Sequence, residues 1–202
     1  MSTQSSSLPL STYSLEDLLR FNEAVYGTAN RRDFNLLMDS RLSEYASRVL
    51  LWVRKKETER IGYHLSMLLS WLLAIANKLG LLMHKEVTLY CATGLPVTAP
   101  LAELQNLFVK RHAKATLPDA SLCFAEKVLA LVSAHGKYQT THQAEHLALV
   151  AKRLAQSFEA LCVVSSLLGF QLNVEFGKHF ENGCHTCWSI PCKGEFELNK
   201  VV

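Results

Sequence analysis

The feature that most constrains this fold is an internal repeat with helical periodicity. The first half opens with Ser14-Leu-Glu-Asp-Leu-Leu-Arg-Phe, and the second half opens 86 positions later with Pro100-Leu-Ala-Glu-Leu-Gln-Asn-Leu. Apolar residues at this spacing lie on one face of a helix, so each half is expected to begin with an amphipathic helix. The matching apolar positions of the two halves are Leu15, Leu18 and Phe21, then Leu101, Leu104 and Leu107.

The remainder of each half continues the same pattern. A second helix is predicted over about 41–54 and about 120–134, followed by a polar break at 55–60 and at 136–141. A long apolar helix then closes each half, and Gly80 and Gly169 stand where a left-handed helix end is expected. A strand is an alternative only for His84 to Cys91. The sequence therefore predicts an all-α fold in which two helical repeats pack about a pseudo-twofold axis.

Composition agrees with a folded helical chain. Of the 202 residues, 49% are apolar and 19% are charged, which excludes wholesale disorder. The net charge of +3 does not by itself indicate nucleic acid or an anionic membrane as a partner. The apolar segment 64–83 is expected to be a buried bundle helix and not a membrane span, because it contains His64, Asn77 and Lys78.

These patterns divide the chain into five parts. We expect an N-terminal tail over 1–13, a first repeat over 14–90, a linker over 91–99, a second repeat over 100–175 and a Cys-containing tail over 176–202. The first residues carry no basic and apolar segments of the secretory kind, so a cytoplasmic location is expected.

The tail holds the most distinctive chemistry. Cys184-x-x-Cys187 places two thiols on one tight turn, and Cys192 follows Pro191. Zn²⁺ takes four soft or borderline ligands, so these three thiols with His179 are candidate ligands of a structural zinc ion. His185 is an alternative fourth ligand with poorer geometry, because it lies between the two thiols. Reduced thiols without a metal, or a redox pair, are the other interpretations.

Three short phrases resemble the MazG-like all-α nucleoside triphosphate pyrophosphohydrolases. They are the opening Leu15-Glu-Asp-Leu-Leu-Arg-Phe-Asn-Glu, the helix end Leu72-Leu-Ala-Ile-Ala-Asn-Lys-Leu-Gly-Leu, and the tail that carries Cys184, Cys187 and Cys192. The resemblance implies a helical fold, association into oligomers, and hydrolysis that releases pyrophosphate. It also implies Mg²⁺ held by Glu-Glu-x-x-Glu and Glu-x-x-Asp patterns on two helices, because residues i and i+3 share a helix face.

Few of those carboxylates are present at the matching positions. Of the eight expected, only Glu44 and Glu126 are acidic, and the segment 62–85 contains no Asp or Glu at all. Catalysis with Mg²⁺ would thus require a rearranged site built from Glu44 and Glu126, with Glu103 or Glu159 added by packing. The matched pairs are Glu44 and Ser47, His64 and Met67, Glu126 and Leu129, and Arg153 and Gln156.

Basic residues gather at corresponding loops of the two halves. Arginine can bind phosphate oxygens without an ion, so these residues are candidates for phosphate binding, although solvated helix ends are the simpler interpretation. His135, His142 and His146 are expected to face solvent. The candidate phosphate-binding residues are Arg31, Arg32, Arg54, Lys55, Lys110 and Arg111.

Three functions follow from these patterns. The first is a catalytically decayed MazG-like protein that binds a nucleotide or a protein partner. The second is a metal-dependent pyrophosphohydrolase with a rearranged site. The third is a nucleic-acid-associated helical protein that contacts phosphates through its basic loops. We expect no membrane partner. We expect the chain to form a homo-oligomer.

Overall fold

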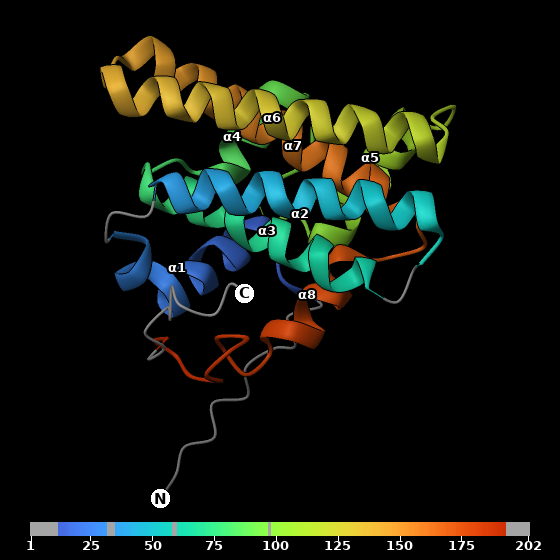
Figure 1. The fold of residues 1–202 in the computed structure, drawn as a ribbon, viewed down its shortest axis with the longest axis horizontal. Helices are drawn as coiled ribbons and strands as arrows, with labels where there is room; N and C mark the ends of the chain where they lie inside the picture. The colour runs from blue at the N-terminus through green and yellow to red at the C-terminus, as the bar shows by residue number, and fades with distance from the viewer. Residues whose placement is uncertain (1–11, 32–34, 58–59, 97, 193–202) are drawn as a thin grey trace, which may run out of the picture.

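The computed structural model describes residues 12–31, 35–57, 60–96 and 98–192, so most of the expected N-terminal tail lies outside the described residues. The described residues form eight helices and no strand, which confirms the predicted all-α fold. Figure 1 shows α6 and α7 across the top of the view and α2 and α3 across the middle. In chain order the helices are α1 (Leu15–Arg31), α2 (Asn35–Lys55), α3 (Ile61–Lys78), α4 (Met83–Cys91), α5 (Leu101–Arg111), α6 (Leu117–Thr141), α7 (Ala144–Leu167) and α8 (Leu172–Phe180).

Side-chain caps stabilise the starts of α1 and α6. Ser14 and Asp17 form a reciprocal capping pair before α1, in which the Asp17 N–H donates to Ser14 Oγ at 3.2 Å and the Ser14 N–H donates to Asp17 Oδ2 at 3.0 Å. Thr116 caps α6 in the same way, because its hydroxyl accepts from the backbone N–H of Asp119.

Two local predictions were wrong. The strand considered for His84 to Cys91 is the helix α4, whose buried residues Met83, His84, Val87 and Cys91 follow helical spacing. The polar break predicted over 136–141 lies inside α6, which continues to Thr141. Tertiary contacts outweigh the polar sequence there, since His135 is fully buried and Tyr138 packs against the core.

Gly80 and Gly169 end the long helices as predicted. Both have positive φ, of 66° and 83°. In each copy the residue after the glycine donates its N–H to a carbonyl five residues back, from Leu81 to Ala76 and from Phe170 to Ser165, both at 2.8 Å. The chain then turns sharply, by 103° between α3 and α4 and by 94° between α7 and α8. The two halves thus bend at equivalent points, 89 positions apart.

No single helix of the described chain is long and apolar enough to cross a membrane. The two bent pairs, α3 with α4 and α7 with α8, meet that length and composition only when taken together.

The two repeats pack around a pseudo-twofold axis. Ser14 and Pro100, which are equivalent positions of the two copies, pair with each other in an isolated antiparallel bridge. A residue that pairs antiparallel with its own equivalent marks the axis of a twofold arrangement. The last helix of each copy also crosses over, because α4 packs on α7 and α8 packs on α3. Each repeat therefore completes the core of the other.

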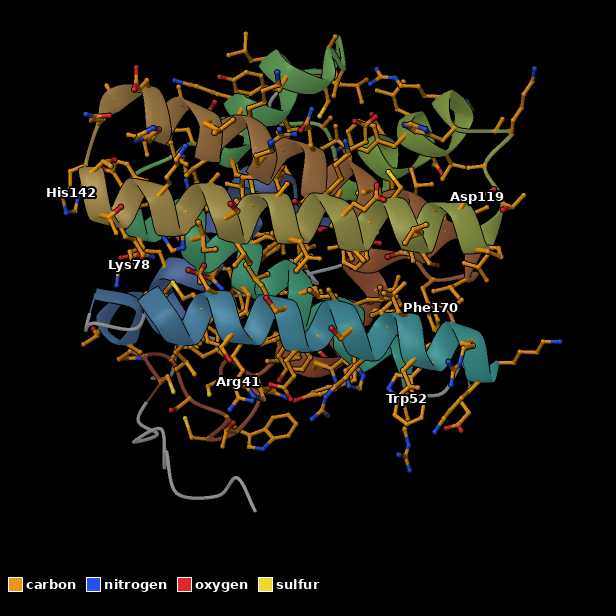
Figure 2. The ribbon with its side chains drawn as sticks, turned by 45° about the horizontal axis from the view of Figure 1, so that its top comes forward. Arg41, Trp52, Lys78, Asp119, His142 and Phe170 are labelled. Atoms are coloured by element: carbon orange, nitrogen blue, oxygen red, sulfur yellow. The ribbon has the colours of Figure 1, made fainter. Side chains whose placement is uncertain are left out.

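The second helices of the repeats lie side by side and run in opposite directions. Figure 2 shows Trp52, near the end of α2, and Asp119, near the start of α6, at the same end of the molecule. Near the other end of this contact, His135 of α6 and Asp39 of α2 are joined through Nδ1 and Oδ1 at 2.7 Å. The expectation that His135 faces solvent was wrong. Its side chain is buried, and its imidazole contacts the carboxylate of Asp39 from the other repeat.

The two glycine turns allow a direct test of the backbone requirement. A Cβ at Gly80 or Gly169 meets nothing within 4 Å, so Gly80→Ala and Gly169→Ala introduce only positive-φ strain. We expect each variant to lower the free energy of unfolding by about 1 to 2 kcal/mol, measured by urea denaturation. Gly136→Ala is the matched control in open space within α6, and it should stabilise by about 0.5 to 1 kcal/mol. Equal effects at all three positions would contradict the assignment.

Candidate functional site

Three sulfur atoms of the tail meet in one cluster. The thiols of Cys184, Cys187 and Cys192 lie within 4.8 Å of one another. Cys192 Sγ is 3.7 Å from Cys187 Sγ and 3.2 Å from Cys184 Sγ. Sulfur atoms bound to one tetrahedral zinc at about 2.3 Å would stand about 3.8 Å apart, so this spacing fits a shared metal ion. These three cysteines are the one group of candidate metal ligands in the part of the chain that the structure describes.

The backbone of this segment, which we call the cysteine knuckle (184–192), is shaped to present the thiols. The Thr186 N–H donates to Cys184 Sγ at 3.4 Å. The Cys184 N–H donates to the Ser189 carbonyl, and the Trp188 N–H donates to the Cys184 carbonyl. Finally, the Cys192 N–H donates to the Val25 carbonyl at 2.8 Å, which fastens the knuckle to α1.

Neither histidine that was considered as a fourth ligand joins the sulfur cluster. His179 packs edge-on against Tyr63, with ring centroids 5.2 Å apart, and burial lowers its pKa. His185 Nδ1 is 3.0 Å from the Tyr26 hydroxyl oxygen, and the His185 N–H donates to the same oxygen at 3.3 Å. Burial raises the pKa of Tyr26, and the nearby Cys184 raises it further, so this hydroxyl remains a proton donor beside the cluster.

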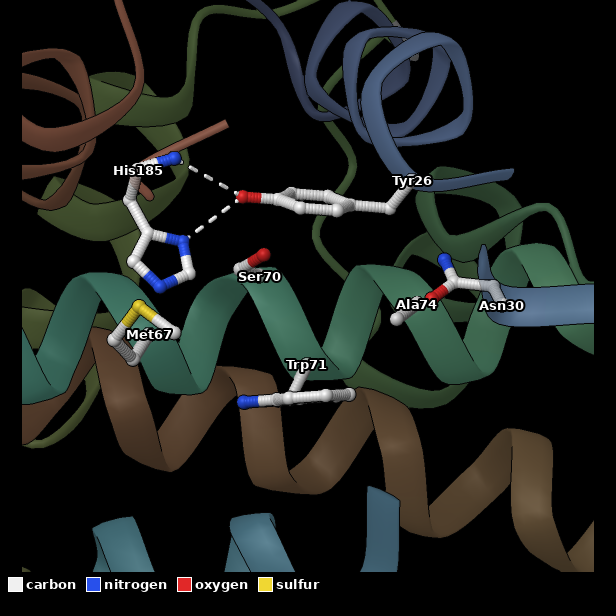
Figure 3. A pocket seen from close by; sticks show the side chains of 7 residues that line it. All are labelled: Tyr26, Asn30, Met67, Ser70, Trp71, Ala74 and His185. Atoms are coloured by element: carbon white, nitrogen blue, oxygen red, sulfur yellow. Dashed lines mark hydrogen bonds between the residues drawn. The ribbon is translucent and has the colours of Figure 1, made fainter. Parts of the chain in front are cut away.

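A small cavity lies where the knuckle meets the first repeat. Figure 3 shows the Tyr26 hydroxyl pointing at His185 over α3, with Met67, Ser70 and Ala74 along that helix. Its volume is about 20 Å³, which suits no more than one water molecule. His185 thus lines this cavity together with residues of α1 and α3.

The first-repeat positions expected to hold Mg²⁺ are occupied differently. Glu44 forms ion pairs of 2.6 Å through both oxygens, with Arg41 Nη1 and Arg48 Nη2. His64 is buried, and its Nδ1 lies 2.6 Å from the Arg60 carbonyl oxygen. Burial lowers the pKa of His64, and the nearby Arg48 also lowers it, so this side chain is neutral near pH 7. Met67 is buried as well.

The second-repeat positions show the same loss. Glu126 is exposed on α6, and Leu129 beside it is 57% exposed. On α7, Arg153 Nη1 donates to Gln156 Oε1 at 3.0 Å. A guanidinium and a carboxamide thus stand where the resemblance implies a second pair of acids.

The candidate phosphate-binding residues that the structure describes stand at the ends of α1, α2 and α5. Arg54 and Lys55 end α2, and Lys55 Nζ lies 5.1 Å from the Trp52 ring centroid. Lys110 is exposed at the end of α5, whereas Arg111 donates to the carbonyl oxygens of Cys91 and Ala92. Cations at helix ends interact favourably with the helix dipole, which accounts for these positions. Arg31 ends α1, and Arg32 lies outside the described residues.

No family model, curated protein or solved structure matches this chain.

The cysteine knuckle predicts a measurable metal content. We expect about one zinc per chain in protein purified without chelator, and near-complete loss of zinc in Cys184→Ser and Cys192→Ser. Elemental analysis together with the thermal unfolding midpoint would measure both effects. Cys123→Ser is the control, because Cys123 is exposed on α6 and should leave the zinc content unchanged. Full zinc content in Cys192→Ser would contradict the site.

The neutral His64 predicts a pH effect. The pKa of His64 is lower in the folded chain than the value of about 6.5 expected for the unfolded chain. As the pH falls through about 6.5, the unfolded state therefore binds a proton at His64 before the folded state does. Stability should therefore fall as pH decreases from about 7 to about 5.5. We expect His64→Gln to show a smaller fall in its urea midpoint than wild type. His142→Gln, which changes an exposed histidine, should match wild type. Identical slopes for all three proteins would refute this role.

Proposed function

We propose that this chain is a catalytically decayed, tandem MazG-like protein that acts as a binding module. The observation that carries the proposal is the state of Glu44, whose two oxygens are both ion-paired to arginines of its own helix. A carboxylate held in this way does not offer a free oxygen ligand to Mg²⁺. The facing position on α3 is the neutral His64, which completes no oxygen cage.

A small-molecule ligand is the form of binding that the geometry favours. A pocket of about 380 Å³ opens among α5, α6 and α7 of the second repeat, which falls in the size range of small-ligand sites. Nucleotides are the first ligands to test because of the family resemblance. Two carboxylates line it, Asp119 and Glu159, and neither belongs to a group of three close metal ligands among the described residues.

A protein partner is the second candidate, and it is favoured by the surface of the cysteine knuckle. Trp188 is 60% exposed and Ile190 is 53% exposed, and both lie in the segment between Cys187 and Cys192. Trp188 also has a positive φ of 55°, a conformation that is unfavourable for a large side chain. Strain of this kind is retained mostly where a residue serves recognition.

The direct test measures pyrophosphate release from ribo- and deoxyribonucleoside triphosphates with Mg²⁺ or Mn²⁺. We expect no release above the protein-free rate, and no difference between wild type and Glu44→Gln. Pyrophosphate added to the assay controls for detection, and circular dichroism controls for folding. Metal-dependent release that Glu44→Gln abolishes would overturn the proposal and favour a pyrophosphohydrolase with a rearranged site.

A further inference from the structure

Two pockets of very different size occupy equivalent places in the two repeats. Met67, Ser70, Trp71 and Ala74 of α3 line the small first-repeat cavity. The residues 89 positions later line the large second-repeat pocket, and they are Gln156, Glu159, Ala160 and Val163 of α7. Tyr26 of α1 likewise corresponds to His112, at the end of α5. The pocket pair thus follows the repeat: one member is small, and the other, which we call the open pocket, is large.

Two features account for the difference in size. Trp71 lines the small cavity, whereas the much smaller Ala160 stands at the same place in the open pocket. His185 of the cysteine knuckle also lines the small cavity, and no residue of the knuckle lines the open pocket. The volume is accordingly about 20 Å³ in the first repeat and about 380 Å³ in the second.

Both acids of the open pocket already have partners. Glu159 Oε1 lies 3.3 Å from Arg111 Nη1 and 3.1 Å from His112 Nε2. Asp119 accepts a hydrogen bond of 2.6 Å from the Thr116 hydroxyl, in the first turn of α6, where the helix dipole favours a negative charge. Glu159 is thus ion-paired with Arg111, whereas Asp119 keeps its negative charge and is held by the Thr116 hydroxyl at the edge of the pocket.

The remaining polar groups of the pocket are donors. Lys127 forms no ion pair with the residues that the structure describes. It stands one helical turn after Cys123 on α6, and both side chains line the pocket. Gln156 accepts from Arg153 through Oε1, which leaves its amide N–H groups to donate. The apolar wall consists of Ala115, Ala120, Ala160 and Val163.

We propose that the open pocket binds a small molecule with an apolar body and a single anionic head group, such as an aromatic monocarboxylate. The head group accepts from Lys127 and Gln156, and the body lies against Ala160 and Val163. This inference rests on the proposed function, because it names the ligand class of the same binding module.

The experiment compares three isosteric probes on the zinc-loaded full chain: 2-naphthoate, the neutral 2-naphthamide and the cationic 2-naphthylmethylamine. Calorimetry measures affinity. Site-resolved mass spectrometry of alkylation measures protection of Cys123, the exposed thiol in the pocket. A charge-assisted hydrogen bond should make the acid bind about tenfold or more tightly than the amide, and should protect Cys123.

Matched variants assign the interaction to the pocket. Lys127→Gln should remove the preference for the acid, whereas Lys152→Gln, which changes an exposed lysine of α7, should retain it. Ala160→Trp installs the residue that fills the first-repeat cavity and should abolish binding of all three probes. Ala160→Leu is a smaller filling variant, for use if the tryptophan variant does not fold, and it should weaken binding.

Several outcomes would overturn the inference. They are equal affinity for the acid and the amine, acid binding that survives both substitutions of Ala160, or Cys123 alkylation that the acid does not slow. A nucleoside monophosphate that binds as tightly as the acid would also refute the proposal that the ligand has an apolar body. If no acid binds and no pyrophosphate is released, only this inference fails. Metal-dependent pyrophosphate release that Glu44→Gln abolishes would instead remove the binding-module proposal itself.

Discussion

The burial of α3 on nearly all sides is the constraint on which the rest of the structure depends. Of its 18 residues, 14 are buried, so no single neighbouring helix can cover it. Within its own repeat α3 packs against α1 and α2, and from the other repeat it receives α7 and α8. A helix that is apolar all round needs such an enclosure. The pseudo-twofold arrangement supplies it, because the bent pair of each copy reaches across to the other.

Much of the fold could be predicted from local patterns. The apolar stripes of α1, α5 and α7, the capping pair at Ser14 and the glycine turns all depend on residues close in sequence. The break at 136–141 was predicted wrongly because a contact with a residue distant in sequence determines the local structure there. The sequence 136–141 looks like a break, yet α6 continues through it because His135 finds Asp39 on α2. In α4, buried residues at helical spacing are too few to outweigh a short apolar pattern that also suits a strand.

The candidate sites divide in the same way. The sulfur cluster was predictable, because the Cys-x-x-Cys spacing alone brings two thiols onto one turn and Pro191 shapes the return. The open pocket was not, because its walls come from α6, α7 and the segment between α5 and α6, and because it has Ala160 where the other copy has Trp71. An alignment of α3 with α7 through their terminal glycines contains that difference, but only the packed helices show that it opens a pocket. The contact of His185 with Tyr26 joins segments 159 residues apart and leaves no local signal.

The crossing of α8 onto α3 has a consequence for the order in which the chain can mature. During synthesis from the N-terminus, the first repeat is made before α8, the helix from the other repeat that covers one side of α3. The helix α3, the most apolar of the described helices, therefore stays partly uncovered until the second repeat and α8 have been made. Exposed apolar surface of this kind is where nascent chains aggregate or recruit chaperones. The duplication that encloses the core therefore also delays its closure.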